Sequence, residues 1–323
     1  MRVVTNAQSK PSQASRQISV ILSRPDSRPE RTAQTDETAA QEVRLNGRRL
    51  PDHGPFAELV KELDQMIGLD NVKDLVYEIY ALLQVSKYRR EAGLSTDAHV
   101  YHMIFKGNPG TGKTTVARIL GRMFQLMGVL PKGHLLEVER ADLVGEYIGH
   151  TAIKTREWVK KALGGVLFID EAYSLARGGE KDFGKEAIDA LVKAMEDYRD
   201  KFVLILAGYP EEMDYFLQTN PGLPSRFPIQ VDFSDYTVDE LLRIAELMAR
   251  NREYHLLPQT LMKLKQLLLQ EKSRSGISFS NARFVRNQIE KAIRHQAVRL
   301  LTDYPQSPGR QELMELRPED LRG

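Results

Sequence analysis

The stretch Gly107-Asn-Pro-Gly-Thr-Gly-Lys-Thr114 decides the fold of this chain. It matches the pattern G-x-x-x-x-G-K-[ST], follows the apolar run His102-Met-Ile-Phe105, and precedes a segment, Thr115–Phe124, with helical apolar spacing. A glycine-rich loop between a strand and a helix points successive backbone N–H groups into one concavity. The motif therefore predicts a loop that binds the phosphates of a nucleotide.

Two side chains of the loop have a chemical role that fits their type. The ammonium group of Lys113 is expected to reach the β- and γ-phosphates, and the hydroxyl of Thr114 is expected to ligate Mg²⁺. The predicted nucleotide-binding residues of this segment are Gly107, Asn108, Pro109, Gly110, Thr111, Gly112, Lys113, Thr114 and Thr115.

Composition narrows the class of protein. The 323 residues suffice for one or two domains, and 41% hydrophobic with 28% charged residues is ordinary for a globular protein. A net charge of +2 gives no reason to expect nucleic acid as a partner. No apolar run approaches the roughly 18–20 residues of a membrane span, and the N-terminus has no apolar signal core. Without cysteine, disulfides and thiolate sites are excluded. We expect a cytoplasmic protein with no membrane span.

Four further strand-like runs alternate with helical segments, at Leu135–Val138, Val166–Ile169, Phe202–Ala207 and Ile229–Phe233. This alternation predicts an α/β fold of the P-loop NTPase type, a parallel sheet with helices on both faces and the ligand at the carboxyl ends of the strands. We expect a disordered N-terminal arm over 1–52 and the α/β nucleotide-binding domain over 53–233.

The strand signal stops after residue 233. A capping box at Thr237-Val-Asp-Glu240 opens an apolar helical run, and two more helices are expected at about Pro258–Lys272 and Asn281–Leu301. A small all-helical lid domain is therefore predicted over 234–301. Residues 302–323 are expected to form a polar C-terminal tail in which Pro318 starts a short helical turn.

Two acids, Asp170 and Glu171, follow the apolar strand Val166–Ile169 directly. At the end of a strand near the loop, Asp170 is expected to hold a water on Mg²⁺ and Glu171 to accept a proton from the attacking water. The alternative is a solvated acidic strand end. An acid in the position of a base favours hydrolysis over transfer to another acceptor.

With these residues the chain resembles the AAA+ ATPases, and within them the group that contains the bacterial and red-type rubisco activases and stage V sporulation protein K. The resemblance extends from about Phe56 to Leu301, and the sporulation protein is the closer match in length. Its most specific stretches are Gly145-Glu-Tyr-Ile-Gly-His-Thr151, Gly164-Gly-Val-Leu-Phe-Ile-Asp-Glu-Ala-Tyr173, Ala207-Gly-Tyr209, Asn220-Pro-Gly-Leu-Pro-Ser-Arg-Phe227 and Ser280-Asn-Ala-Arg283.

The resemblance implies ATP as the nucleotide, with Mg²⁺, and contacts from Ile67, Gly68 and Leu69 to adenine. That segment is otherwise a simple turn between helices. Ala207-Gly-Tyr209 departs from the family, many of whose members have Asn or Thr there to orient the attacking water. Which residue takes that role is left open.

The resemblance also assigns two arginines. Arg226 stands where the family has an arginine finger that reaches the γ-phosphate of the neighbouring subunit, so a subunit alone would hydrolyse ATP poorly. The alternative for Arg226 is a salt bridge to a local acid such as Asp232. Arg283 resembles the second sensor, a cation that the lid brings to the γ-phosphate, with Arg286 as a competing candidate.

A loop between two glycines carries the remaining expectation. Tyr147 and Ile148 match the aromatic–aliphatic pair with which the family grips a polypeptide in the pore of a hexamer; the alternative is a loop anchored by a buried tyrosine. The resemblance implies a homo-hexameric ATP-driven remodeller of an unidentified protein client, with a role in spore maturation. The alternatives are a nucleotide-dependent assembly switch and a rubisco-activase-type chaperone without a role in sporulation.

Overall fold

The computed structural model describes residues 44–45, 48–49, 55–96, 99–147, 149–178, 182–220, 222–276, 279–303 and 307–322. The predicted arm over 1–52 lies outside them except for two short antiparallel strands, β1 (Arg44–Leu45) and β2 (Arg48–Arg49). None of the helices in these ranges combines the length and the apolar character that crossing a membrane requires.

Five parallel strands form the central sheet in the order β4-β5-β6-β3-β7. Each predicted strand is present, and Ile229–Phe233 lies at an edge of the sheet. The strand that precedes the glycine-rich loop, β3, therefore lies in the interior of the sheet. The bounds are β3 Met103–Gly107, β4 Leu135–Val138, β5 Val166–Ile169, β6 Val203–Gly208 and β7 Ile229–Phe233.

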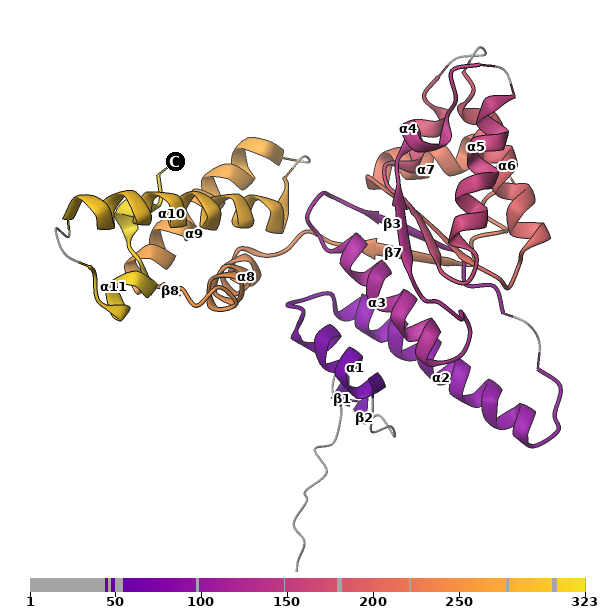
Figure 1. Ribbon diagram of the computed structural model, residues 1–323, viewed down its shortest axis with the longest axis horizontal. Coiled ribbons are helices and arrows are strands. Elements are labelled where there is room, and N and C mark those ends of the chain that lie inside the picture. The colour runs from indigo at the N-terminus through magenta and orange to yellow at the C-terminus, as the bar shows by residue number, and fades with distance from the viewer. Residues whose placement is uncertain are drawn as a thin grey trace, which may run out of the picture. The chain divides into compact units, whose positions relative to one another are not determined.

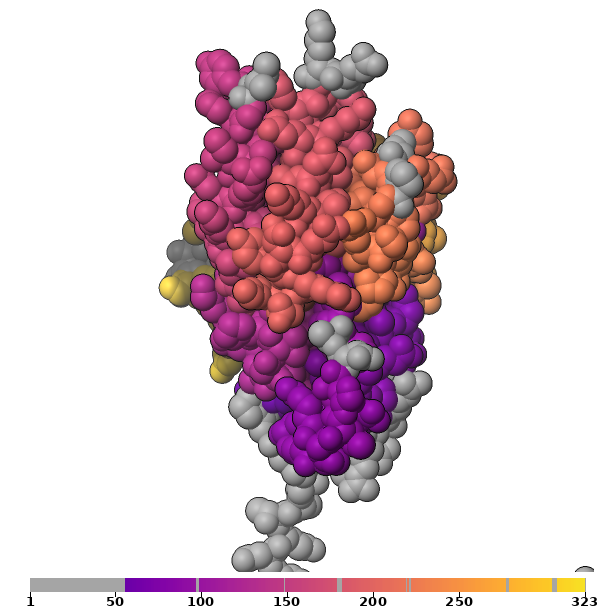
Figure 2. All heavy atoms as spheres, turned by 90° about the vertical axis from the view of Figure 1, so that its right-hand side faces the viewer, coloured from indigo at the N-terminus to yellow at the C-terminus, as the bar shows by residue number. Residues whose placement is uncertain are grey.

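The continuous apolar runs of the strands supply both faces of the sheet, because successive side chains of a strand point to opposite sides. In β5, Phe168 packs with one hydrophobic cluster, while Leu167 and Ile169 pack with the other. The first cluster includes residues of α1 (Pro55–Gln65), α2 (Asp70–Glu91) and α3 (Lys113–Leu126). The second includes residues of α5 (His150–Ala162), α6 (Gly184–Asp197) and α7 (Pro210–Thr219). Figure 1 shows these helices, and Figure 2 looks onto the magenta and red surface of α5 and α6.

The predicted α/β fold, a parallel sheet with helices on both faces, is thus confirmed. Its helical segments are α1 Pro55–Gln65, α2 Asp70–Glu91, α3 Lys113–Leu126, α4 Arg140–Leu143, α5 His150–Ala162, the 3-10 helix η1 Ala172–Ala176, α6 Gly184–Asp197 and α7 Pro210–Thr219.

The helical lid follows β7, as expected. Its first helix begins with the predicted capping box, in which the Thr237 hydroxyl accepts from the Glu240 N–H and the Glu240 carboxylate accepts from the Thr237 N–H. The lid helices are α8 Val238–Arg250, α9 Pro258–Ser275 and α10 Asn281–Asp303.

The end of the chain differs from the polar tail predicted for 302–323. Residues 307–322 contain α11 (Arg310–Met314), β9 (Glu315–Leu316) and the 3-10 helix η3 (Pro318–Asp320), and β9 pairs in parallel with β8 (His255–Leu256). The turn predicted at Pro318 is present.

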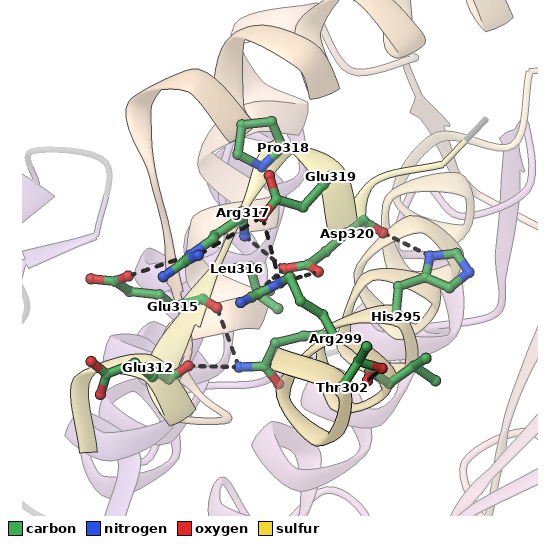
Figure 3. Close-up of polar contacts among 12 residues, drawn as sticks. His295, Arg299, Thr302, Glu312, Glu315, Leu316, Arg317, Pro318, Glu319 and Asp320 are labelled. Atoms are coloured by element: carbon green, nitrogen blue, oxygen red, sulfur yellow. Dashed lines mark hydrogen bonds and ion pairs between the residues drawn. The ribbon is translucent and has the colours of Figure 1, made fainter. Parts of the chain in front are cut away.

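Buried groups attach this C-terminal segment to α10 (Figure 3). The Arg299 guanidinium donates to both carboxylate oxygens of Asp320 at 2.9 Å, and Asp320 is 1% exposed. Gln296 donates to the backbone oxygens of residues 312, 313 and 315, and Leu316 and Leu321 are fully buried. The expectation of a tail was wrong because two isolated leucines give no periodic signal, yet both find a place in the lid core.

Candidate functional site

The glycine-rich loop leaves β3 and enters α3, as its sequence predicts. A side chain at Gly107 has no room, since a Cβ atom there would lie 2.5 Å from the Phe233 carbonyl oxygen. Gly110 and Gly112 have φ of 74° and 103°, in the left-handed region that favours glycine. The backbone is thus shaped by its glycines into a loop that ends on the N-terminus of a helix.

Lys113 folds back over this loop. Its ammonium group donates to the carbonyl oxygens of Gly107 at 2.7 Å and Asn108 at 2.9 Å. Burial lowers the pKa of Lys113; the nearby Asp170 carboxylate opposes this shift, and the Arg283 guanidinium adds to it. The ammonium is therefore held at the loop among charges from the α/β domain and the lid.

The two predicted acids lie at the end of β5. The Asp170 N–H donates to the Val138 carbonyl oxygen at 3.1 Å, and the Asp170 carboxylate accepts from the Glu171 N–H at 3.0 Å. Glu171 has φ of 47°, a left-handed conformation that is costly for a residue other than glycine. This backbone turns the chain sharply between the strand and η1.

The structure brings the loop, the acids and the lid together around one cavity of about 450 Å³. The predicted site residues that line it are Ile67, Gly107, Pro109, Gly110, Gly112, Lys113, Thr114, Thr115, Asp170, Glu171 and Arg283. Arg286, the competing candidate for the second sensor, also lines it, so the geometry leaves both arginines available.

Two residues of the loop, Asn108 and Thr111, do not line the cavity but make contacts beside it. Thr111 is fully buried, and its hydroxyl donates to the Asn108 carbonyl oxygen at 2.8 Å. The side chain of Asn108 donates to the carboxylate of Asp235 at 3.0 and 3.1 Å.

One part of the cavity wall is apolar. Met66 and Ile67 line it from the turn before α2, and Ile244, Leu247 and Met248 line it from α8. Gly68 and Leu69 do not line the cavity; Leu69 is buried, with its Cδ1 atom 3.4 Å from where a Cβ atom of Gly112 would be. A flat apolar base would contact the first set, while Leu69 packs beneath the glycine-rich loop.

Arg226 lies outside this cavity. Its guanidinium forms an ion pair with Glu196 of α6 and donates to the Gly222 carbonyl oxygen at 2.8 Å. The local acid is thus Glu196 rather than the expected Asp232, whose backbone oxygen accepts from Asn71. In this chain alone, Arg226 does not reach the residues that surround the glycine-rich loop.

Tyr147 is on the surface and is 65% exposed. Its ring meets His150 edge-on at 5.4 Å, and the buried Thr151 accepts from the Gly145 N–H at 2.9 Å. A loop anchored by a buried tyrosine is therefore contradicted, since a threonine is the buried residue. Ile148 lies outside the described residues.

The end of β6 presents Tyr209 to the cavity, while Ala207 is fully buried. The Tyr209 ring lies 6.0 Å from the Tyr173 ring, and Gly208 leaves no room for a side chain because a Cβ atom would be 2.6 Å from Tyr173. Of Ala207, Gly208 and Tyr209, where the sequence departs from the family, Tyr209 alone offers a polar side chain to the cavity.

The donor set fits a nucleotide with its cation. Backbone N–H groups at a helix N-terminus and an ammonium suit phosphate oxygens. The Thr114 hydroxyl and the Asp170 carboxylate are oxygen ligands of the kind that Mg²⁺ prefers. Thr114 donates to the Glu137 carboxylate at 3.4 Å, so its hydroxyl is oriented from the neighbouring strand β4.

Several cavity residues were missed from the sequence, namely Met66, Tyr236, Ile244, Leu247 and Met248. The helical spacing of the last three was visible, but the same spacing serves a helix core. Tyr236 donates its hydroxyl to the Thr111 carbonyl oxygen at 3.1 Å, a contact between segments 125 residues apart that no local pattern encodes.

Two family models match the chain. Residues 103–235 match the ATPase family associated with various cellular activities (AAA), and residues 237–323 match the AAA lid domain. The junction between the two models falls at the linker after β7.

Relatives cover most of the chain. Stage V sporulation protein K of Bacillus subtilis is 58% identical over 272 residues, which is 83% of each chain. Protein CbbX of Cereibacter sphaeroides is 45% identical, covering 82% of this chain and 86% of its own. The chloroplastic ribulose bisphosphate carboxylase/oxygenase activase of Cyanidioschyzon merolae is 44% identical, covering 82% and 90%.

Among solved structures, a mutant of RuvB from Thermotoga maritima superposes with a TM-score of 0.52 at 21% identity. The superposition covers 80% of this chain and 69% of RuvB. At this identity the likeness concerns the fold alone.

Proposed function

The chain belongs to the AAA family of ATPases and hydrolyses ATP, and from this premise we propose that a ring of its subunits uses hydrolysis to remodel a protein client. The observation that carries the proposal is the separation of three features on one chain. The glycine-rich loop and both acids share a cavity, whereas Arg226 and the exposed Tyr147 lie elsewhere.

Within the cavity, each side chain has a role that follows from its chemistry. Lys113 exchanges its bonds to the loop carbonyls for bonds to phosphate oxygens when ATP binds. Glu171 accepts a proton from the water that attacks the γ-phosphate, and Tyr209 orients that water. Mg²⁺, which Thr114 and Asp170 would hold, supplies charge neutralisation at the phosphates.

Adenine takes the apolar part of the cavity, against Ile67 and the α8 side chains Ile244 and Met248. Arg283 supplies the positive charge from the lid to the γ-phosphate. Glu171→Gln should then bind ATP but hydrolyse it at least about 100-fold more slowly, because the base is lost while the phosphate contacts remain. Hydrolysis at the unaltered rate would remove Glu171 from this role.

Arg226 acts on the γ-phosphate held by the neighbouring subunit. Its ion pair with Glu196 keeps it on the surface of α6, so the guanidinium must exchange that partner when subunits assemble. The ATPase rate per subunit should therefore rise with protein concentration, and Arg226→Ala should lower it by about 10³-fold.

Mixing two inactive variants tests this arrangement directly. In a random equal mixture of Arg226→Ala and Glu171→Gln, about a quarter of the sites pair an intact Glu171 with an intact Arg226 from the neighbour. Recovery of about a quarter of the ATPase rate is expected for action between subunits. If each site used its own Arg226, the mixture would recover nothing.

Tyr147 provides the grip on the client. An exposed aromatic side chain in a loop between two glycines, Gly145 and Gly149, offers non-specific apolar contact to a polypeptide. Tyr147→Ala should abolish unfolding of a client while it leaves basal ATP hydrolysis intact. The matched control is Tyr215→Ala, since Tyr215 on α7 is 68% exposed. Equal client unfolding in both variants would favour a nucleotide-dependent assembly switch instead.

We further propose a client in spore maturation, supported by the 58% identity to stage V sporulation protein K against 45% to CbbX. Expression of this chain in Bacillus subtilis that lacks its own stage V sporulation protein K should restore heat-resistant spores, and the Glu171→Gln variant should not. Reactivation of an inhibited red-type rubisco without spore rescue would establish the rubisco-activase-type alternative.

A further inference from the structure

One carboxylate, that of Asp235, joins the glycine-rich loop to the lid. Asp235 follows β7 and is the last residue that the AAA model matches. Its Oδ1 atom accepts from the Asn108 side chain at 3.0 Å and from the Asn281 side chain at 2.7 Å. Asn108 belongs to the loop and Asn281 is the first residue of α10, so three segments far apart in sequence meet at this oxygen.

Asn281 is built into this position. It is fully buried, and its φ of 46° is left-handed, a conformation that asparagine tolerates better than most residues. Its Oδ1 accepts from the Tyr236 N–H at 3.0 Å, while its Nδ2 donates to Asp235 and to the Phe279 carbonyl oxygen at 3.0 Å. Donor and acceptor sides of the amide are both used, which fixes its orientation.

The start of α10 lies directly on the loop as a result. The Ala282 N–H donates to the Gly110 carbonyl oxygen at 3.3 Å. A Cβ atom on Gly110 would be 2.4 Å from the Ser280 carbonyl oxygen and 2.7 Å from the Arg283 nitrogen. Arg283 follows Asn281 by two residues and lines the cavity. The hydrogen bonds that hold Asn281 therefore also fix the stretch of backbone that carries the Arg283 side chain.

We propose that Asp235 and Asn281 are positioning residues that hold Arg283 at the γ-phosphate position, and thereby couple the nucleotide state to the lid. The proposal rests on the proposed function, because it needs Arg283 to act on the γ-phosphate. Asn108 extends the coupling into the loop itself, because its side chain donates to the same carboxylate that anchors the start of α10.

The chain allows a swap of the two groups. Asn281→Asp places two carboxylates against each other and should reduce the preference for ATPγS over ADP by at least about tenfold, together with kcat. In the double variant Asp235→Asn with Asn281→Asp, the amide at 235 donates to the carboxylate at 281. The carboxylate still accepts from the Tyr236 N–H but leaves the Phe279 carbonyl oxygen without its donor. The swapped pair should therefore recover at least about threefold in preference and kcat over Asn281→Asp alone, without reaching the unaltered chain.

A second variant removes the amide without backbone strain. Asn281→Gly retains the left-handed conformation but loses every side-chain bond, and should lower the ATPγS preference by about tenfold while ADP affinity changes little. Its matched control is Glu253→Gly, since Glu253 is an exposed left-handed residue of the lid with φ of 61°. Affinities are measured by anisotropy of fluorescent ATPγS and ADP, with thermal unfolding of each variant alongside.

An unchanged ATPγS preference in Asn281→Gly, or a swapped pair that folds but restores nothing, would overturn the coupling. In either case, hydrolysis by the unaltered chain and its loss in Glu171→Gln would leave the proposed ATPase mechanism standing. Failure of the unaltered chain to hydrolyse ATP would instead overturn both.

Discussion

Acidification should destabilise the α/β domain through one buried histidine, His102, which immediately precedes β3. Its side chain is 1% exposed and packs against the rings of Phe202 and Phe227 at 5.5 and 6.1 Å. The Nδ1 atom accepts from the Leu204 N–H at 3.0 Å, so the neutral ring carries its proton on Nε2. A second proton would have to enter at Nδ1, where it faces that N–H.

The size of the effect follows from the pKa. Burial lowers the pKa of His102 from 6.5 to about 4, so the unfolded chain takes up a proton at a higher pH than the folded protein does. The contribution of the neutral His102 ring to stability is therefore fully present above about pH 6.5, and it is lost as the pH falls toward about 4. Proton linkage gives a loss of about 2 kcal/mol between pH ~7.5 and pH ~5, and about 3 kcal/mol once both states are protonated.

The assay compares pH dependences rather than stabilities. His102→Asn retains an acceptor for the Leu204 N–H but cannot titrate, so its free energy of unfolding should fall by about 2 kcal/mol less over the same pH interval. Urea unfolding is followed by fluorescence of Trp158, the one tryptophan, which lies in α5 of this domain. His99→Asn, at an exposed neighbouring position, is the control. Identical pH dependence in His102→Asn and the unaltered chain would refute the reasoning.

Three further substitutions test the packing around the cavity and the lid. Asp320→Asn leaves the Arg299 charge without its buried partner and should lower the urea stability of the lid by about 3 kcal/mol, with faster proteolysis at the C-terminus. Gly110→Ala should weaken binding of fluorescent ADP by at least about tenfold, whereas Gly128→Ala, with a similar φ of 72° and nothing within 4 Å, should not. In thermal unfolding, the free energy of unfolding of Glu171→Gly should be about 1 kcal/mol higher than that of Glu171→Gln, because glycine relieves the strain of the left-handed backbone.

Much of the α/β domain was predictable because its signals are local. The glycine-rich loop encodes its own backbone shape, and four-residue apolar runs such as Val166–Ile169 suit strands buried on both faces. Parallel strands end at the same edge of a sheet, so the proximity of Asp170 to Lys113 followed from the strand assignment alone. The lid helices followed from their apolar spacing and the capping box at Thr237.

Contacts between distant segments were not predictable in the same way. Glu196 rather than Asp232 pairs with Arg226 because the choice of partner depends on how α6 lies beside the loop after α7. Burial of Leu316 depends on β9 pairing with a strand some 60 residues earlier, a match that requires the folded lid. The link of Asp235 to two asparagines has the same origin.

Strained backbone marks the borders of the cavity. Among the described residues, non-glycine positions with positive φ are Leu69, Glu171, Glu253 and Asn281. Three of these four lie in or beside the walls: before α2, after β5 and at the start of α10. Each such conformation costs about 1–3 kcal/mol and persists only where the surroundings over-determine it. The cavity is therefore shaped by backbone turns in three separate segments, so a side-chain substitution such as Glu171→Gln can remove the chemistry while leaving the binding geometry intact.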